Sequence, residues 1–366
     1  MMSPRVLIAA GGTGGHVFPA LAVARELVRQ GWHAEWVGSD RGLEARVVPN
    51  AGIGLHILRF TGLRGKGLRA WLSLPVRLIR AVREAHQIVG RARPEVVVAF
   101  GGYVTFPVGL VASLLRIPLC VHEQNAVMGS ANRWLSRLAQ RVMVSFPSTR
   151  YAPRSAAVIG NPVREEIHAL ADPAERYGHR TGPLKVLVVG GSLGAAALNA
   201  SLPGLFAEAI RHGQPLLIQH QTGPQGLDAV IAEYRRLNVG AVCTAFIQDM
   251  DAAYRDADLV ICRAGASTVT EVAAAGVAAL FIPLPNAIDD HQSANARTLV
   301  DQSAAWMIPQ GQLASQEMAR WLAGISRSDL MERACKARGH AMHGAARRAA
   351  EMVGSIHRCG PLGGSL

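Results

Sequence analysis

The sequence predicts an α/β protein made of two doubly wound domains, each built on a mainly parallel sheet. Three observations support this fold class. Short apolar runs alternate with helical segments along the chain, and strand–helix alternation is typical of parallel sheets. A glycine-rich turn, Gly11–Gly15, follows the first apolar run, and a second one recurs at Gly190–Gly194. Finally, 366 residues are enough for two or three domains of ordinary size.

The first half of the chain opens with a predicted strand, Arg5–Ala10, which leads into the first glycine turn. A helix follows to about residue 30, because Leu21, Ala24 and Val28 recur at helical spacing. The other predicted elements alternate in the same way: strands near 34–37, 55–59, 95–100 and 118–121, and helices over 68–91 and 105–115.

Residues 96–115 are 20 consecutive uncharged residues, a length that suffices to cross a bilayer. Gly101, Gly102, Pro107 and Gly109 interrupt this stretch. We therefore predict a buried strand, a turn and a helix in place of a membrane span.

The second half repeats the opening pattern. Residues 146–185 are rich in Pro, Gly, Arg and Ala, which is typical of a junction between domains. The strand Lys185–Val189, the second glycine turn and a helix from Ala195 come next. Further strands are predicted near 215–219, 240–244, 258–262 and 277–282, and helices at 226–236, 249–255, 268–275 and 290–299.

Composition and charge narrow the class of protein. With 49% hydrophobic and 17% charged residues the chain is globular, and five scattered cysteines without a Cys-x-x-Cys pair support neither a zinc ribbon nor a disulfide framework. Residues 1–163 hold 20 Lys or Arg and 7 Asp or Glu, whereas residues 164–366 hold 18 and 19. A positive field concentrated in the first half attracts nucleic acid, anionic lipid or a phosphorylated substrate.

Both glycine turns are predicted to bind anions. A strand-to-helix turn without Cβ atoms lets the backbone approach phosphate, and the first N–H groups of the helix point outward. Val17 stands where the third glycine of the dinucleotide fingerprint belongs, which weakens NAD binding, although Asp40 remains able to serve a ribose. The sequence contains no P-loop motif.

The second turn also fits the nucleophile elbow of α/β-hydrolases, with Ser192 as the nucleophile. An esterase is therefore the alternative function. It leaves the first glycine turn and the basic first half unexplained.

Several polar residues are candidates for chemistry. His16 lies at the start of a helix, where the dipole favours a neutral imidazole that can accept a proton. The two Asp-x-Asp pairs at 249–251 and 256–258 resemble metal-binding motifs of sugar transferases, but we interpret them as helix caps and helix ends. Residues 289–291, Asp-Asp-His, fit either a metal cluster or the first turn of a helix.

One predicted helix carries an apolar stripe bordered by arginines, which suits the surface of an anionic membrane. The alternative is an ordinary helix whose apolar side faces the core and whose basic side faces solvent. A glycine-rich loop at 62–67 precedes it, and Pro75 is expected to interrupt it. The stripe consists of Leu68, Trp71, Leu72, Pro75, Leu78, Ile79 and Val82, and the flanking arginines are Arg69, Arg77, Arg80 and Arg83.

Taken together, the motifs resemble the MurG family, the lipid-linked N-acetylglucosaminyltransferases of bacterial peptidoglycan synthesis. They are GGTGGH at 11–16, GLRGKG at 62–67, GGY at 101–103, HEQN at 122–125, GNPVR at 160–164, GGS-x-GA at 190–195, RAGASTVTE at 263–271, and DDHQ with NA at 289–296. The resemblance runs from about residue 5 to 355.

The resemblance implies a GT-B fold, in which two Rossmann-like domains face a cleft between them. It implies an inverting hexosyl transfer of N-acetylglucosamine from UDP-GlcNAc to the C4 hydroxyl of the N-acetylmuramoyl unit of lipid I, which gives lipid II. Such a protein acts in cell wall biogenesis and hence in cell shape, cell cycle and cell division. It needs no cofactor and no resident metal, binds no nucleic acid, and sits peripherally on the cytoplasmic face of the inner membrane.

The domains carried over from the family are an acceptor- and membrane-binding domain, residues 1–163, and a UDP-GlcNAc-binding domain, residues 164–341. A C-terminal helix at about 342–358 is expected to pack back onto the first domain.

Residue roles also follow from the resemblance. For the donor, Glu271 is expected to bind the ribose hydroxyls and Ile247 the uracil edge, while Arg164, Ser192 and the segment Ala266, Ser267, Thr268, Val269, Thr270 hold the diphosphate. Asn125 and Gln292 are expected to contact the GlcNAc hydroxyls, and Thr13, Gly14 and Gly15 to lie where donor and acceptor meet. Gly101, Gly102 and Tyr103 are expected to bind the lipid I diphosphate, and His16 matches the general base. One departure is Leu193, where the family commonly has Gln.

Overall fold

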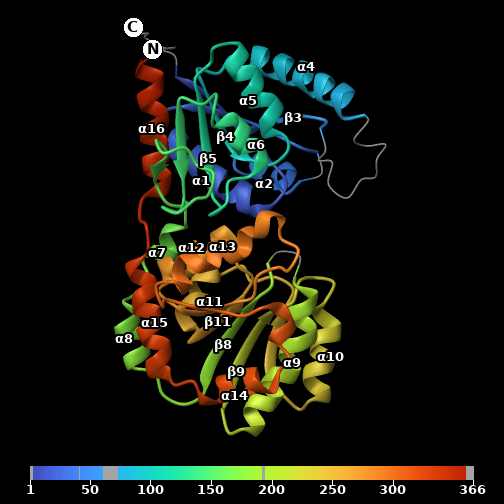
Figure 1. Ribbon diagram of the computed structural model, residues 1–366, viewed down its shortest axis with the longest axis vertical. Coiled ribbons are helices and arrows are strands. Elements are labelled where there is room, and N and C mark those ends of the chain that lie inside the picture. The colour runs from blue at the N-terminus through green and yellow to red at the C-terminus, as the bar shows by residue number, and fades with distance from the viewer. Residues whose placement is uncertain (1–2, 41, 61–72, 192–193, 360–366) are drawn as a thin grey trace. The chain divides into compact units, whose positions relative to one another are not determined.

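The computed structural model describes residues 3–40, 42–60, 73–191 and 194–359. The chain divides into two compact units (Figure 1). One contains the residues up to Pro162 together with those from Gly344 on, and the other is Val163–His343.

The first unit is a sheet of parallel strands in the order β3-β2-β1-β4-β5-β6-β7. Its strands are β1 Arg5–Ala10, β2 His33–Gly38, β3 Gly54–Ile57, β4 Val96–Gly101, β5 Leu119–Glu123, β6 Arg141–Val144 and β7 Ala157–Val158. Its helices are α1 Gly14–Arg29, α2 Glu44–Asn50, α4 Leu74–Ala92, α5 Thr105–Leu114, α6 Ser130–Leu135 and α16 Ala345–Cys359.

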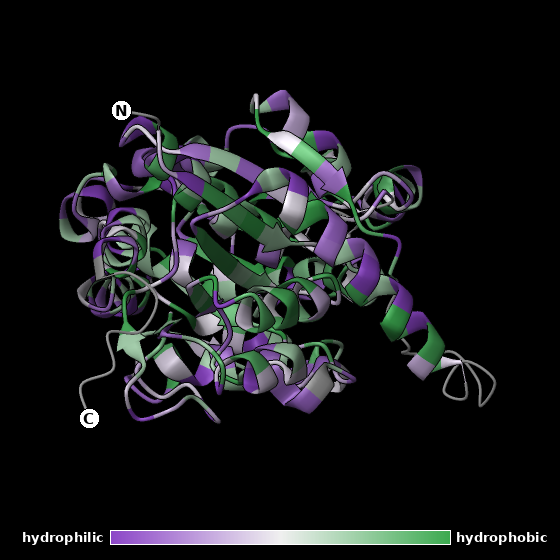
Figure 2. Ribbon diagram, turned by 90° about the horizontal axis from the view of Figure 1, so that it is seen from above, coloured by the Kyte–Doolittle hydropathy of each residue, from purple (hydrophilic) through white to green (hydrophobic). Residues whose placement is uncertain are grey.

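Alternation along the strands explains why this sheet is covered on both faces. In β1, Val6 and Ile8 belong to the core that is shared with α1 and α16, whereas Leu7 and Ala9 belong to the core shared with α4 and α5. Both sets are almost fully buried, as a doubly wound parallel sheet requires. In Figure 2 the apolar strands lie in the interior, with mixed helices around them.

The second unit is a sheet of parallel strands in the order β10-β9-β8-β11-β12-β13. Its strands are β8 Leu184–Val189, β9 Leu216–Gln221, β10 Ala241–Thr244, β11 Leu259–Cys262, β12 Ala278–Phe281 and β13 Trp306–Met307. Its helices are α7 Glu165–His168, α8 Pro173–Gly178, α9 Ala196–Arg211, α10 Leu227–Arg236, α11 Met250–Asp256, α12 Ala266–Ala275, α13 His291–Val300, α14 Gln316–Gly324 and α15 Arg327–Gly339, with short 3₁₀ turns at Ile288–Asp290 and Gln310–Gln312.

The predicted strands are confirmed, each to within two residues at either end. Within the predicted junction at 146–185 the structure has β7, α7 and α8, which sequence reasoning missed because they are short.

The helix expected over 68–91 is described from Leu74 onward. Pro75 lies in its first turn, where the missing N–H costs no hydrogen bond. The 62–67 loop and Leu68, Arg69, Trp71 and Leu72 lie outside the described residues.

Candidate functional site

In the first unit the predicted site residues gather where the strand order reverses. Strands β1 and β4 are neighbours there, and in open α/β sheets ligands bind beyond the carboxyl ends of the strands at such a point. Three adjacent strands contribute. Thr13, Gly14, Gly15 and His16 follow β1, Gly101, Gly102 and Tyr103 end or follow β4, and Asn125 follows β5.

His16 lies in the first turn of α1, and its ring is partly buried. Nδ1 is 3.0 Å from the carbonyl oxygen of Phe100, the residue before Gly101. The side-chain amide of Gln124 reaches the same ring nitrogen at 2.5 Å. Gly101 has a φ of +105°, and a Cβ there would lie 2.7 Å from Nδ1. The ring therefore rests directly on a backbone position where a side chain would push it out of place.

Glu44 organises the first glycine turn, and sequence reasoning missed it. Its carboxylate is fully buried; Oε2 accepts a hydrogen bond from the N–H of Gly12, and Oε1 accepts from the N–H and hydroxyl of Ser39. The N–H of Gly12, in the turn predicted to bind an anion, is thus already bonded to Glu44, and the buried carboxylate of Glu44 lies beside the turn. The first turn is therefore poorer in anion-binding groups than its glycines suggested.

The HEQN motif is held by Glu123, whose buried carboxylate accepts hydrogen bonds from both the backbone N–H and the side-chain amide of Asn125. It also accepts from Gly129 N–H and from the amide of Asn132. His122 is fully buried, and burial lowers its pKa to about 4, so it is neutral near pH 7. The two hydrogen bonds to Glu123 fix Asn125 in place at the end of β5.

In the second unit the order reverses between β8 and β11, and the second glycine turn follows β8. Gly194, at a φ of +78°, lies so close to the carbonyl of Thr222 that no side chain fits there. The amide of Gln221 donates to the carbonyl of Gly191 at 2.8 Å, and its oxygen accepts from the N–H of Ile247 at 3.4 Å. The turn and the predicted uracil contact are thus tied together. Ser192 and Leu193 lie outside the described residues.

The first turn of α12, which follows β11, has features of an anion site. Its cap residue Gly265 supplies no side-chain hydrogen bond to the first N–H groups. The hydroxyl oxygen of Ser267 is shielded from solvent and has no hydrogen-bond partner among the described residues. Uncapped N–H groups beside an unpaired buried hydroxyl favour a bound phosphate.

Glu271 lies one turn further along α12. The hydroxyl of Tyr254, which is fully buried, donates to Glu271 Oε2 at 3.0 Å. Burial raises the pKa of Glu271, and the positive charge of Arg164 opposes that rise. Arg164 caps α7, which packs against α12. The predicted ribose and phosphate residues therefore lie close together.

The remaining acidic candidates have structural roles. Asp249 caps α11 by accepting from the N–H of Ala252, and the buried carboxylate of Asp258 pairs with Arg180 and Arg327, as expected of cap and loop residues. No group of three or more His, Cys, Asp or Glu side chains in the described part of the chain could hold a metal ion.

Gln292 lies on α13, after β12, at the same edge of the sheet as the donor residues. Its side-chain oxygen accepts from the N–H of Leu284 at 2.9 Å, which fixes the amide in place. Its N–H₂ group is the part that suits a sugar hydroxyl.

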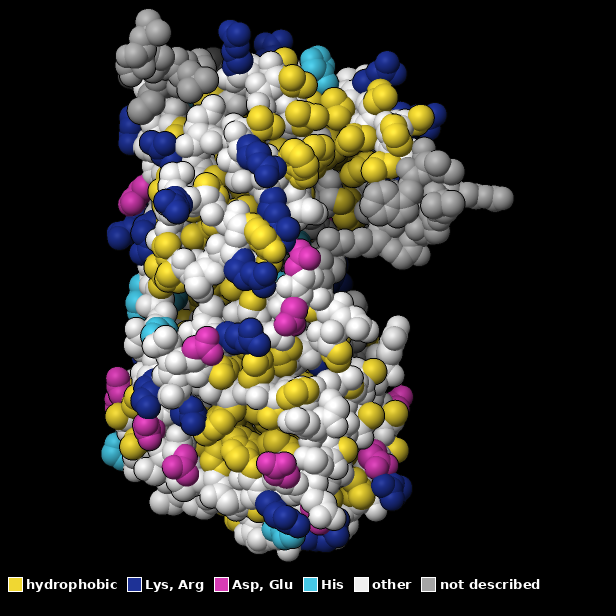
Figure 3. Space-filling view, viewed as in Figure 1, with side chains coloured by type: hydrophobic (Ala, Val, Ile, Leu, Met, Phe, Trp, Pro, Cys, Tyr) yellow, Lys and Arg dark blue, Asp and Glu magenta, His cyan; other side chains and the backbone are white. Residues whose placement is uncertain are grey.

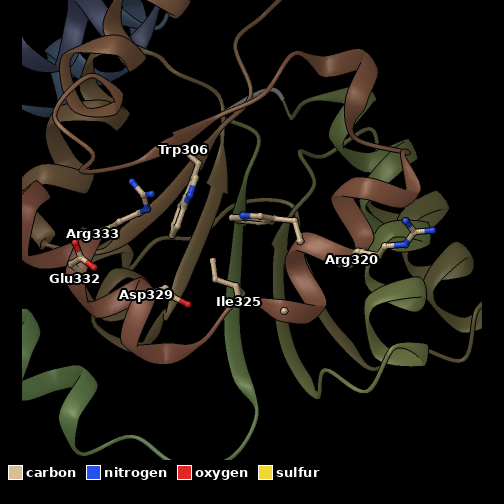
Figure 4. Close-up of a pocket in the computed structure, with 8 residues that line it drawn as sticks. Trp306, Arg320, Ile325, Asp329, Glu332 and Arg333 are labelled. Atoms are coloured by element: carbon tan, nitrogen blue, oxygen red, sulfur yellow. The ribbon is translucent and has the colours of Figure 1, made fainter.

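A pocket of about 420 Å³ lies elsewhere in the second unit, at the edge strand β13 (Figure 4). Trp306 and Trp321 meet edge to face in it, and Arg333 stacks on the Trp306 ring at 4.0 Å. None of the predicted site residues lines this pocket.

The predicted membrane stripe divides between core and surface. Leu78 and Val82 pack against the core, which corrects the single apolar face inferred from spacing, whereas Ile79 is more than half exposed. Val76, which did not belong to the predicted stripe, is also more than half exposed. On the neighbouring helix α5, Leu114 is 69% exposed. Figure 3 shows apolar side chains gathered over α4 and α5, with Lys or Arg side chains around them. Among the described residues, no helix combines the length and the apolar character that crossing a bilayer requires.

Comparisons with known proteins cover both units. Residues 6–144 match the glycosyltransferase family 28 N-terminal domain, and residues 185–350 match the C-terminal domain of the same family. The chain is 53% identical, over 96% of its length and 98% of the relative's, to the UDP-N-acetylglucosamine–N-acetylmuramyl-(pentapeptide) pyrophosphoryl-undecaprenol N-acetylglucosamine transferase of Bordetella parapertussis. It is 49% identical to the protein of the same name from Cupriavidus metallidurans, over 97% of this chain and 99% of the relative.

Solved structures agree with these matches. The crystal structure of Acinetobacter baumannii MurG superposes with a TM-score of 0.85 at 40% identity, covering 96% of this chain and all of that one. The calicheamicin glycosyltransferase CalG4 is similar with a TM-score of 0.67 at 18% identity, covering 97% of this chain and 98% of that one, which supports the shared fold alone.

Proposed function

The chain belongs to the MurG family of N-acetylglucosamine transferases and has their GT-B fold, and we propose how its residues carry out the reaction. It transfers N-acetylglucosamine from UDP-GlcNAc to lipid I, giving lipid II. The observation that carries the proposal is that each unit brings its family-matched residues to the carboxyl ends of its strands, where the strand order reverses. The esterase alternative depends on Ser192, which lies outside the described residues, so no described contact favours it.

The second unit, Val163–His343, takes the donor. Glu271, oriented by Tyr254, accepts hydrogen bonds from the ribose hydroxyls, and Ile247 meets the uracil edge. The diphosphate lies at the first turn of α12, where Ser267 and the charge of Arg164 bind its oxygens. Gln292 donates to a hydroxyl of the GlcNAc ring. The N–H groups of the first turn of α12, the Ser267 hydroxyl and Arg164 also stabilise the negative charge that develops on the leaving UDP, and each key donor of this kind contributes about 3 kcal/mol.

The first unit takes the acceptor. Gly101, Gly102 and Tyr103 bind the lipid I diphosphate, while Asn125 contacts the hydroxyls of the GlcNAc that is transferred. His16 removes the proton of the C4 hydroxyl as its oxygen attacks the anomeric carbon. The bond from that carbon to the UDP oxygen breaks on the opposite face, so the configuration inverts.

The exposed apolar side chains of α4 and α5 and the arginines around them bind an anionic membrane surface. Val76, Ile79 and Leu114 enter the interface between headgroups and acyl chains, and the exposed Arg80 and Arg83 meet lipid phosphates. A chain without a described membrane-spanning helix thereby reaches a substrate whose undecaprenyl tail stays in the bilayer. The protein then acts as a peripheral protein at the cytoplasmic face of the inner membrane.

Transfer of radiolabelled GlcNAc from UDP-GlcNAc to a short-chain lipid I analogue tests the function, beside equilibrium binding of UDP-GlcNAc, NADH and ATP with and without magnesium. We expect a labelled disaccharide product, and we expect the protein to bind UDP-GlcNAc but neither NADH nor ATP. Release of free GlcNAc that does not depend on the acceptor would contradict the proposal.

A further inference from the structure

The side-chain amide of Gln124 lies beside the His16 ring. Gln124 is 1% exposed, and its amide nitrogen lies 2.5 Å from His16 Nδ1. The carbonyl oxygen of Phe100 lies 3.0 Å from the same ring nitrogen. The amide oxygen of Gln124 is buried and has no hydrogen-bond partner among the described residues.

The two orientations of this amide correspond to two tautomers of the neutral ring. With the amide nitrogen toward His16, Gln124 donates to an unprotonated Nδ1. The ring proton is then on Nε2, and the ring cannot accept a proton there. Rotation of the amide by half a turn exchanges its oxygen and nitrogen. The oxygen then accepts from Nδ1–H, and Nε2 is left as the basic atom.

The carbonyl of Phe100 favours the second arrangement. This oxygen can only accept, so a proton on Nδ1 satisfies it, whereas the first arrangement places two acceptors 3.0 Å apart. With the proton on Nδ1, the side chain of Gln124 must turn its oxygen toward the ring, because its amide N–H₂ group would otherwise face another N–H at 2.5 Å.

We propose that Gln124 is a positioning residue that, together with the carbonyl of Phe100, keeps the proton of neutral His16 on Nδ1 and leaves Nε2 free to accept the proton of the attacking hydroxyl. This inference rests on the proposed role of His16 as the base. The proton moves from the acceptor hydroxyl to Nε2 as the new glycosidic bond forms and the bond to UDP breaks. The resulting imidazolium donates Nδ1–H to two acceptor oxygens, neither of which takes the proton.

The tautomer is measured directly in the full-length protein, without substrate, from long-range ¹H–¹⁵N correlations of the imidazole rings. The His16→Asn spectrum identifies the His16 signals by their absence. We expect the wild-type ring to carry its proton on Nδ1 at pH 8. A proton on Nε2 would overturn the proposal.

Turnover of two variants supplies the second readout. Gln124→Leu keeps the bulk but cannot accept, so kcat should fall on the order of 10- to 100-fold, as for loss of other residues that orient a reacting side chain, with an unchanged KM for UDP-GlcNAc. Gln124→Glu accepts from Nδ1–H, so it should restore kcat at high pH. It should also move the acid limb of the pH–rate profile upward, because a carboxylate stabilises the imidazolium.

Gln140→Leu is the matched control. Its amide oxygen accepts from the N–H of Leu119 at 2.7 Å, at the opposite end of β5, and it should leave turnover unchanged. A Gln124→Leu enzyme as active as the Gln140→Leu enzyme, or a Gln124→Glu enzyme no better than Gln124→Leu with an unshifted profile, would overturn the proposal. A His16→Ala enzyme with normal kcat would instead remove the base role, whereas the measured tautomer would stand.

Discussion

Replacement of Gly101 by alanine tests whether the backbone beneath His16 positions its ring. The new Cβ would lie 2.7 Å from Nδ1 and 2.8 Å from Cε1. Ordinary contacts of this kind are about 3.5 Å, so the ring must move by roughly 0.8 Å. A misplacement of that order costs a reaction about 100-fold. We expect kcat of Gly101→Ala to fall about 30- to 100-fold, with little change in the KM for UDP-GlcNAc, whose proposed nucleotide-binding residues lie in the other unit.

Gly31→Ala is the matched control, because Gly31 has a φ of +88° and no atom lies within 4 Å of the position its Cβ would take. Both variants place alanine at a positive φ, which costs ~1–2 kcal/mol, so both should lower the melting temperature to a similar extent. Only Gly101→Ala should lose turnover in the radiolabel transfer assay. If Gly101→Ala turned over within about threefold of Gly31→Ala, the proposed seat for the base would be refuted.

The other predictions concern the base, the donor and the pH dependence of stability. His16→Ala should lower kcat by roughly 10²–10⁴, and a loss below about threefold would assign His16 to structure. Glu271→Ala should raise the KM for UDP-GlcNAc strongly, and Tyr254→Phe should raise it less, because Tyr254 acts through Glu271. Equal KM values in the wild type and both variants would show that neither residue belongs to the site. Burial lowers the pKa of His220 from its ordinary 6.5 to about 4. As the pH falls from 6.5 to 4, His220 is therefore protonated in the unfolded chain but stays neutral in the folded protein, which favours unfolding. The melting temperature should therefore drop between pH 6.5 and 4, and His220→Asn should show a shallower drop; parallel curves would contradict this origin.

The elements that sequence reasoning placed well are those with strong local signals. The apolar run of β1 and the glycines after it determine strand and turn by themselves, and the same holds for β8. In contrast, β13 has two residues and α7 has four, too few to show any periodicity.

The site residues divide in the same way. His16 and Glu271 were predicted because they stand in motifs that resemble a family. Glu44 and Tyr254 were not, because each acts through a contact between residues distant in sequence. Glu44 meets Gly12 across 32 residues, and Tyr254 meets Glu271 across 17. For Glu44 the only signal in the sequence was an acidic residue shortly after a strand. The identity of a single residue does not show whether its side chain is buried.

The α4 surface shows a different limit. Helical spacing grouped Leu78, Ile79 and Val82 into one stripe, yet the core takes Leu78 and Val82, and Ile79 faces solvent. Adjacent residues on a helix point about 100° apart, so a wide stripe can serve core and surface together. Vesicle binding should accordingly weaken with salt and with loss of Arg80 and Arg83, and salt-independent binding would point to an apolar contact alone.

A crystal structure with UDP-GlcNAc bound is the most direct measurement. The ribose hydroxyls should lie against the carboxylate of Glu271, and the two phosphates at the first turn of α12, within reach of the Ser267 hydroxyl. Density for the nucleotide between Trp306 and Trp321, or on the first unit's glycines, would contradict this placement.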